Sequence, residues 1–338
     1  MREIKIGVVG LLWGQRHVGT IQNIDGARVS AVAYDRTLPD GTTVEEFAKR
    51  FGATAFKDGI DMIEHAEIDA VDICTSPKWR EPLIAAAAKR GLPVLIEKPM
   101  ALNVAQAQKY AKIAEDAGIP LMVEYPFRFL PAVQRMKELL DGGPLGRPIS
   151  VEGNLQTTWN PPKGHWTWDA GNKGGVVLES GCHLIDTLCF LCGEPQTVYS
   201  IGGSVQRHGD QEDTVAMIIE FKNRSHALVN IGGLGTNAYK NPMFVRVYAE
   251  HGEASVSGED WRFSVVEWAL ADDTEPRREE LEQPARFEVP RFNLMNFARV
   301  VRDGIAPPCS ATDGIRVQRV IEAMARSIKS GQPAHVTP

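Results

Sequence analysis

The first third of the chain alternates short apolar runs with stretches of helical periodicity. The apolar runs predict strands at 4–9, 29–34, 70–74, 94–96 and 121–123, and the periodic stretches predict helices at 14–24, 42–51, 80–90 and 105–117. This rhythm is typical of a doubly wound parallel sheet with helices on both faces. In such sheets ligands bind at the carboxyl ends of the strands, and the polar residues that follow each run fall there.

The pattern changes near residue 125. A helix is predicted at 131–140, and longer alternating segments follow at 149–158, 198–205, 214–221, 225–232, 243–249 and 262–268. These segments predict an α/β domain with a large, open, mostly antiparallel sheet. Further helices are predicted at 181–191, 291–302 and 313–330. We therefore predict a first domain at 1–124 and a second at 125–338, whose tail helices are free to pack back on the first.

Composition narrows the class of protein. The 338 residues carry a net charge of −6, which argues against a nucleic-acid binder that depends on charge. The chain has no run near the ~18 apolar residues of a membrane helix, and its start does not resemble a signal peptide. We interpret the five cysteines as core thiols and not as metal ligands, so no metal is predicted. So few cysteines in a chain of this length also favour a cytoplasmic location.

A glycine turn follows the first predicted strand. In Gly10-Leu11-Leu12-Trp13-Gly14-Gln15, only Gly10 stands in register with the dinucleotide fingerprint G-x-G-x-x-G; Leu12 takes the second position and Gly14 comes one place early. The alternative is an ordinary turn without a nucleotide. Asp35, at the end of the second strand, favours NAD by bonding ribose hydroxyls, whereas Arg36 could meet the 2′-phosphate of NADP. The candidate cofactor-binding residues are Gly10, Leu12, Trp13, Gly14, Asp35, Arg36, Thr75, Ser76, Pro77, Glu97 and Lys98.

Two further motifs carry candidate chemistry. Glu97-Lys98-Pro99 at a strand end places an ammonium where it could polarise a substrate oxygen, the alternative being a surface lysine in a turn. In a helix that begins near Glu179, His183 lies four residues on, flanked by Glu179 and Asp186, as a general base requires. The alternative is an acid at the helix start beside a buried structural histidine.

Taken in order, the glycine turn, Asp35, the Thr/Ser-Pro turn, Glu-Lys-Pro and the Gly-Gly…Glu-x-Gly-x-His-x-x-Asp stretch resemble the Gfo/Idh/MocA oxidoreductases. The resemblance implies a Rossmann domain, an open sheet that forms an oligomer interface, and hydride transfer between nicotinamide and a sugar or cyclitol carbon. It implies that Lys98 binds the reacting hydroxyl and that His183 is the catalytic base. The chain departs from the family pattern at Leu12, at Glu81 and at Glu179, where many members carry aspartate.

We therefore predict an NAD-dependent dehydrogenase, with NADP as the alternative cofactor, that assembles as a homodimer or homotetramer and binds neither nucleic acid nor membrane. Lys98, His183 and Glu179 are the expected catalytic residues. The candidate substrate-binding residues are Lys98, Tyr125, Arg128, Trp166, Glu179, His183 and Asp186. Two other functions stay open: an NAD-dependent glycoside hydrolase or isomerase on the same scaffold, and a non-catalytic sugar or nucleotide sensor.

Overall fold

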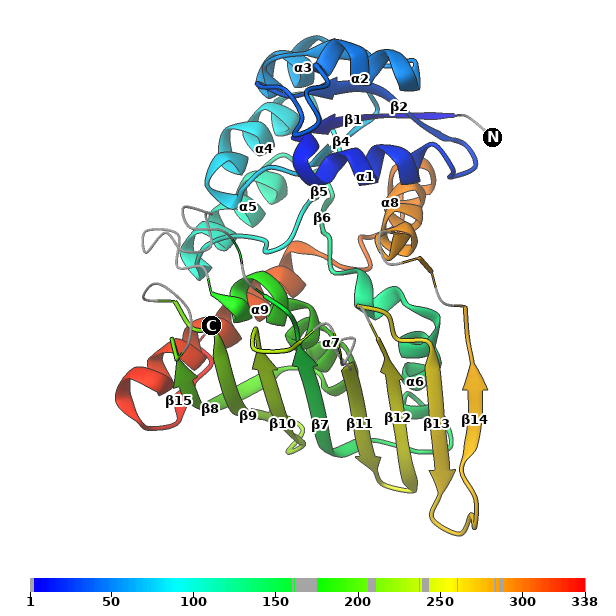
Figure 1. Cartoon of the computed structure of the whole chain (residues 1–338), viewed down its shortest axis with the longest axis vertical. Coiled ribbons are helices and arrows are strands. Elements are labelled where there is room, and N and C mark those ends of the chain that lie inside the picture. The colour runs from blue at the N-terminus through cyan, green and yellow to red at the C-terminus, as the bar shows by residue number, and fades with distance from the viewer. Residues whose placement is uncertain are drawn as a thin grey trace. The chain divides into compact units, whose positions relative to one another are not determined.

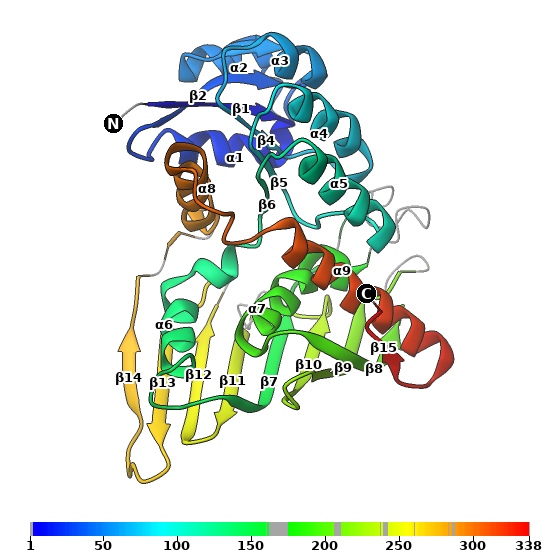
Figure 2. The same cartoon turned by 180° about the vertical axis from the view of Figure 1, so that it is seen from behind.

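The computed structural model describes residues 3–159, 161, 175–205, 211–236, 238, 243–259, 261–282, 284–285 and 288–337 (Figures 1 and 2). The chain divides into two compact units. Unit 1 comprises Met1–Ala101, Ala105–Tyr125 and Pro290–Ile315, and unit 2 comprises Leu102–Val104, Pro126–Val289 and Arg316–Pro338. A segment from near the end of the sequence thus belongs to the unit that contains the first strand.

Unit 1 is built on a six-stranded parallel sheet of order β3-β2-β1-β4-β5-β6. The strands are β1 (Ile4–Val9), β2 (Ala27–Ala33), β3 (Thr54–Phe56), β4 (Ala70–Ile73), β5 (Val94–Ile96) and β6 (Leu121–Val123). The helices are α1 (Leu11–Ile21), α2 (Val44–Phe51), α3 (Gly59–His65), α4 (Arg80–Lys89), α5 (Val104–Asp116) and α8 (Arg291–Asp303), with a 3₁₀ turn η1 (Pro77–Trp79). The strand order reverses between β1 and β4, which is where doubly wound sheets bind their ligands.

Unit 2 contains a nine-stranded mixed sheet of order β14-β13-β12-β11-β7-β10-β9-β8-β15. Its strands are β7 (Pro148–Gln156), β8 (Pro195–Gly203), β9 (Thr214–Phe221), β10 (His226–Gly232), β11 (Met243–Ala249), β12 (Gly252–Gly258), β13 (Val265–Leu270), β14 (Arg277–Glu280) and β15 (Ala334–His335). Neighbouring strands are antiparallel except for β7 and β10, which run parallel. The predicted fold class is therefore confirmed in both units.

One face of this sheet is covered by helices. Figures 1 and 2 show α6 (Pro131–Leu140), α7 (Cys182–Cys192) and α9 (Ala311–Ser330) on the same side of the strands. Alternate residues of the strands point into this layer and are buried, as Val151, Met217, Val229 and Val245 show. The hydroxyl of Ser327 in α9 accepts a hydrogen bond from the β8 backbone at 2.9 Å, which ties the tail helix to the sheet.

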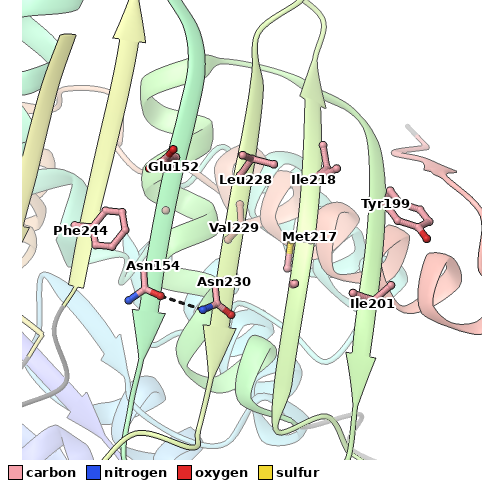
Figure 3. Close-up of a pocket in the computed structure, with 12 residues that line it drawn as sticks. Glu152, Asn154, Tyr199, Ile201, Met217, Ile218, Leu228, Val229, Asn230 and Phe244 are labelled. Carbon is pink, nitrogen blue, oxygen red and sulfur yellow. Dashed lines mark hydrogen bonds between the residues drawn. The ribbon is translucent and has the colours of Figure 1, made fainter. Parts of the chain in front are cut away.

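The opposite face of the sheet carries the other set of side chains. Figure 3 shows them standing on adjacent strands, with Asn230 of β10 donating to Asn154 of β7 at 3.2 Å. Large apolar side chains are exposed here, among them Ile201 (61%), Leu228 (46%) and Ile218 (43%). The alternation predicted from the sequence thus separates a helix-covered face from an open apolar face.

Of the described helices, none has both the length and the apolar character needed to cross a membrane.

Candidate functional site

The glycine turn of unit 1 is one residue shorter than the usual fingerprint, and α1 begins directly after Gly10. Gly10 has φ +90, and a Cβ there would lie 3.1 Å from the backbone of Cys74. A Cβ on Gly14 would lie 3.1 Å from Val8 Cγ1 and 3.2 Å from Cys74 Cβ. Gly14 therefore provides the close packing of helix on strand that the third glycine of the fingerprint usually provides. The sequence prediction placed the helix start at residue 14 because it did not recognise the shortened turn.

The start of α1 is suited to a phosphate group. Gly10 precedes it without a side-chain cap, and the first N–H groups of a helix have no partner within the helix. Together with the positive end of the helix dipole, these donors form an anion site. Leu12 (58% exposed) and Trp13 (38%) stand at this turn, and the guanidinium of Arg16 lies 4.0 Å from the Trp13 ring centroid.

Asp35 and Arg36 follow β2 at the same edge of the sheet. Arg36 Nε donates to Asp35 Oδ1 at 3.0 Å, and both side chains are 67% exposed. The hydrogen bond from Arg36 holds the pKa of Asp35 below its usual value. Asp35 is therefore an ionised hydrogen-bond acceptor, and Arg36 is engaged by its neighbour.

The turn that follows β4 contains the residues for which the sequence predicts a crevice wall. Thr75, Ser76 and Pro77 follow β4, and the hydroxyl oxygens of Thr75 and Ser76 are buried with no hydrogen-bond partner among the described residues. Buried hydroxyls in proteins nearly always bond to something, so these two oxygens fit a bound ligand. With the uncapped helix start and Asp35, they fit the dinucleotide that the fingerprint predicts.

The turn after β5 carries Glu97 and Lys98. Glu97 is 6% exposed, whereas Lys98 is partly exposed, and the Lys98–Pro99 peptide is cis. The fully buried guanidinium of Arg80 donates to the carbonyls of Glu97 and Met100, which fixes this turn from below. Lys98 thus lies on a backbone held by hydrogen bonds at the carboxyl edge of the sheet.

Beneath this turn lies a buried group that sequence reasoning missed. His17 of α1 is fully buried, and its Nδ1 lies 2.8 Å from Asp72 Oδ2. Ligand atoms of His17, Asp72 and Cys74 lie within 4.8 Å of one another, as in a metal site. Zinc takes the thiolate, however, and burial raises the pKa of the Cys74 thiol. We interpret the group as a hydrogen-bonded network.

In unit 2, the residues around His183 begin in an unusual helical turn. A π-helical segment, η5 (Val177–Gly181), contains Glu179 and leads directly into α7, which contains His183. Single π-helical turns are frequent at functional sites. The hydroxyl of Ser180 donates to the Glu179 carboxylate, which is partly exposed. The predicted helical segment that contains Glu179 and His183 is present. Its first turn is π-helical and therefore wider than an α-helical turn.

The His183 ring, 7% exposed, is held by aromatic rings. It stacks on Phe127 with centroids 4.8 Å apart and meets the Trp261 ring edge-on at 5.9 Å. Trp261 has φ 69, a backbone conformation that is uncommon for a bulky residue and that marks strained functional positions. Neither aromatic residue was singled out from the sequence, because no local motif connects them to the histidine.

Asp186 and Arg128 pair with each other. Arg128 Nε donates to Asp186 Oδ2 at 2.9 Å, Arg128 Nη2 donates to Oδ1, and the two side chains are 3% and 0% exposed. The sequence reasoning had both residues binding substrate and Asp186 as one of two candidates to orient His183. In the structure they form a buried two-pronged ion pair that joins η2 (Pro126–Phe129) to α7.

The remaining predicted substrate residues have separate outcomes. Tyr125 is fully buried, and Trp166 lies outside the described residues.

Glu212, which the sequence did not indicate, accepts a hydrogen bond from the Val177 backbone at 3.3 Å. Burial raises the pKa of Glu212 to about 7, so this carboxyl at the start of η5 changes charge near neutral pH.

The fold and the dinucleotide turn together define an NAD-binding oxidoreductase. The chain belongs to the Gfo/Idh/MocA oxidoreductase family: the sequence model of its NAD-binding Rossmann fold matches residues 4–125, and that of its C-terminal α/β domain matches residues 137–336. The resemblance inferred from the motifs is confirmed.

Individual relatives cover nearly the whole chain. Inositol 2-dehydrogenase 4 of Saccharopolyspora erythraea is 27% identical over 98% of this chain and 95% of its own length. D-apiose dehydrogenase of Paraburkholderia graminis is 24% identical over 98% of this chain and 89% of its own length. A levoglucosan dehydrogenase solved with NADH and levoglucosan superimposes with a TM-score of 0.89 at 20% identity, covering all of both chains.

Proposed function

We propose that this chain is an NAD-dependent dehydrogenase that transfers a hydride between nicotinamide and a hydroxyl-bearing carbon of a sugar, sugar derivative or cyclitol. The observation that carries the proposal is the rigid turn that presents Lys98 at the same sheet edge as the dinucleotide turn. The curated relatives support the substrate class, since one acts on a sugar and another on a cyclitol.

The proposal assigns one proton-handling group to each unit. In the oxidation direction, bound NAD⁺ supplies the hydride acceptor. Lys98 donates a hydrogen bond to the reacting oxygen and stabilises the negative charge that develops on it. His183 accepts the hydroxyl proton as general base, and the aromatic rings of Phe127 and Trp261 fix its orientation. Glu179, one turn earlier, stabilises the charged imidazole or binds a substrate hydroxyl.

The proposal also specifies the cofactor preference and the setting. Asp35 favours NAD over NADP because a carboxylate repels a 2′-phosphate. All five cysteines are free thiols, which fits a reducing compartment, and we propose the cytoplasm. We further propose that the chain assembles with copies of itself through the open face of the unit 2 sheet, and that it binds no nucleic acid.

The test is a turnover screen with NAD⁺ and NADP⁺ over aldoses, sugar acids, cyclitols and glycosides. NADH absorbance is followed beside glycoside cleavage, because cleavage without NADH accumulation would assign the alternative hydrolase function. On the substrate found, Lys98→Ala and His183→Ala should each lower kcat about 10²- to 10⁴-fold. Lys89→Ala, at the end of α4, and His226→Gln, at the start of β10, are the matched controls and should keep normal turnover.

Near-normal activity of both Lys98→Ala and His183→Ala would refute the assignment of roles. Tight binding of NAD and sugar without turnover of any substrate would favour the sensor function instead.

A further inference from the structure

A network of buried polar side chains, most of them ionisable, lies under the carboxyl edge of the unit 1 sheet. It gathers residues from α1, from the ends of three parallel strands and from α8. Its members are His17, Asp72, Cys74, Glu97, Glu124 and Asn293, of which only Cys74 has more than a few per cent of its surface exposed. Apart from Glu97, none of them has a place in the function proposed above.

His17 stands at the centre of this network, between two carboxylates. Its Nδ1 lies 2.8 Å from Asp72 Oδ2, and its Nε2 lies 3.3 Å from Glu97 Oε1. A neutral imidazole carries no charge, whereas the imidazolium donates a hydrogen bond from Nδ1 to Asp72 and forms an ion pair with Glu97 across Nε2, an atom with no hydrogen-bond partner among the described residues. Two buried carboxylates without a cation between them would be strongly unfavourable. The geometry therefore fits a charged His17.

The side chains around the His17 imidazole affect its pKa. Burial alone would lower the pKa of His17, but Cys74 and Asp72 beside it outweigh that effect and hold the pKa well above its ordinary value. Burial raises the pKa of Glu124 well above its ordinary value, and its Oε2 accepts a hydrogen bond from Asn293 at 2.7 Å. The Cys74 Sγ also lies 3.4 Å from Nδ1 of His17.

The turn that carries Lys98 is therefore held from two sides. Arg80 binds its backbone through the carbonyls of Glu97 and Met100. His17 reaches its side chain through the Glu97 carboxylate, and Asp72 anchors His17 from β4. These contacts connect the helix that begins at the dinucleotide turn with the residue next to Lys98, within a single unit.

We propose that His17 is a positioning residue for the hydride-transfer reaction: held by Asp72, it fixes the Glu97 side chain and so sets the position and the electrostatic surroundings of Lys98. The inference rests on the proposed role of Lys98. Removal of the positive charge of His17 leaves Asp72 without its ion-pair partner and leaves Arg80 as the buried cation that still interacts with Glu97, so the Lys98 ammonium becomes harder to deprotonate and its turn loses one of its two supports.

The experiment compares His17→Gln with His65→Gln in the full-length enzyme. His65 is the matched control because it also lies near an aspartate, at 2.9 Å from Asp61, but 67% of its side chain is exposed on α3. His17→Gln should lower kcat about 10- to 100-fold, the size of effect that misplaced reacting groups produce, with a smaller change in KM for NAD⁺. When kcat is plotted against pH, one limb of the wild-type profile should be absent from Lys98→Ala. In His17→Gln, that limb should lie at higher pH than in the wild type.

A double variant and a spectroscopic measurement separate positioning from mere stability. The fold-loss of kcat in His17→Gln/Glu97→Gln should be smaller than the product of the fold-losses in the two single variants. The reason is that the double variant also removes the Glu97 carboxylate, which loses its imidazolium partner in His17→Gln. In the wild-type enzyme, ¹⁵N NMR of labelled histidine should show both ring nitrogens of His17 protonated at pH 8, with assignment from the signal missing in His17→Gln. Should that variant not fold, Asp72→Asn replaces it: the His17 signal is then the one that shifts, and the same kinetics are measured.

Two results would overturn the inference: a His17 ring that is neutral at pH 8, or a His17→Gln enzyme with the kcat and pH profile of the wild type. An active Lys98→Ala enzyme would instead overturn the role proposed for Lys98. The NMR measurement does not depend on turnover, so the two failures are distinguishable.

Discussion

Asp35 is the residue on which cofactor choice should depend. Its carboxylate holds Arg36 by a 3.0 Å hydrogen bond, so its removal both ends the repulsion of a 2′-phosphate and frees a guanidinium to bind one. We expect Asp35→Ser to raise kcat/KM for NADP⁺ about tenfold and to lower it for NAD⁺ by a similar factor, each corresponding to about 1.4 kcal/mol. Steady-state kinetics with both cofactors measure this.

Asp25→Ser is the control for that exchange, because Asp25 precedes β2 and so lies at the opposite edge of the sheet from Asp35. It should leave the ratio of NAD⁺ to NADP⁺ turnover unchanged. A ratio that also stays constant in Asp35→Ser would show that the carboxylate does not contact the ribose.

Arg128 and Asp186 lead to a different prediction, since their side chains are buried against each other. Arg128→Met should destabilise unit 2 by about 3–5 kcal/mol, because it leaves the Asp186 carboxylate buried without a partner. Arg128→Met/Asp186→Leu should recover much of that loss. Urea unfolding measures both, and Arg147→Met, which breaks the exposed pair with Glu250, should cost about 0–1 kcal/mol.

If Arg128 instead binds substrate, as the sequence reasoning had it, Arg128→Met would raise KM and leave the free energy of unfolding nearly unchanged.

At the residue scale, the sequence predicted the groups that belong to short motifs. Asp35, Thr75, Ser76, Glu97 and Lys98 follow strands directly, so the parallel topology alone brings them to one edge. His17, Phe127 and Trp261 were not predicted, because each reaches its partner through tertiary packing across 55 or more residues of chain or through a strained turn. The pairing of Asp186 with Arg128 was not predicted either, because it has no signal in local spacing.

At the element scale, α1 offers a matched pair of glycines. A Cβ on Gly14 would be in tight contact with Val8 and Cys74, whereas a Cβ on Gly19 has nothing within 4 Å. Gly14→Ala should therefore destabilise unit 1 by about 1–3 kcal/mol through overpacking. Gly19→Ala should stabilise it by up to about 1 kcal/mol, because glycine in a helix interior is less favourable than alanine. Thermal unfolding compares the two variants in one background.

A Gly14→Ala protein as stable as wild type would mean that α1 can move away from β1 at little cost. In that case Gly14 would not perform the packing role of the third fingerprint glycine, and the shortened turn would need another explanation.

Periodicity and apolar runs predicted the bounds of several elements and missed five others. Strands at 94–96, 121–123, 214–221 and 243–249 and the helix at 131–140 have the predicted bounds, since buried runs and clear alternation define them. The sequence reasoning missed β3, α3, β12, β14 and β15. Three of these have two to four residues, and β12 alternates small residues that give a weak hydrophobic signal.

The whole molecule presents one large feature without a partner among the described residues, which is the open face of the unit 2 sheet. Tyr199, Ile201, Ile218, Leu228 and Phe244 are each 37–61% exposed there, on strands that lie side by side in Figure 3. Soluble monomers rarely expose so continuous an apolar surface, and a flat sheet face is self-complementary under two-fold symmetry. We therefore expect the enzyme in solution to have at least twice the 37.2 kDa mass of one chain.

Ile201→Glu/Leu228→Glu should convert that assembly to monomers, because each interface would then bury four unpaired carboxylates. Both side chains point away from the helix-covered face, so circular dichroism should stay unchanged. Met295→Glu, at a 45% exposed position of α8 in unit 1, is the matched control and should keep the wild-type mass. Light scattering after gel filtration measures all three. A wild-type mass of 37.2 kDa, or a double variant that stays assembled, would show that copies do not associate through this face.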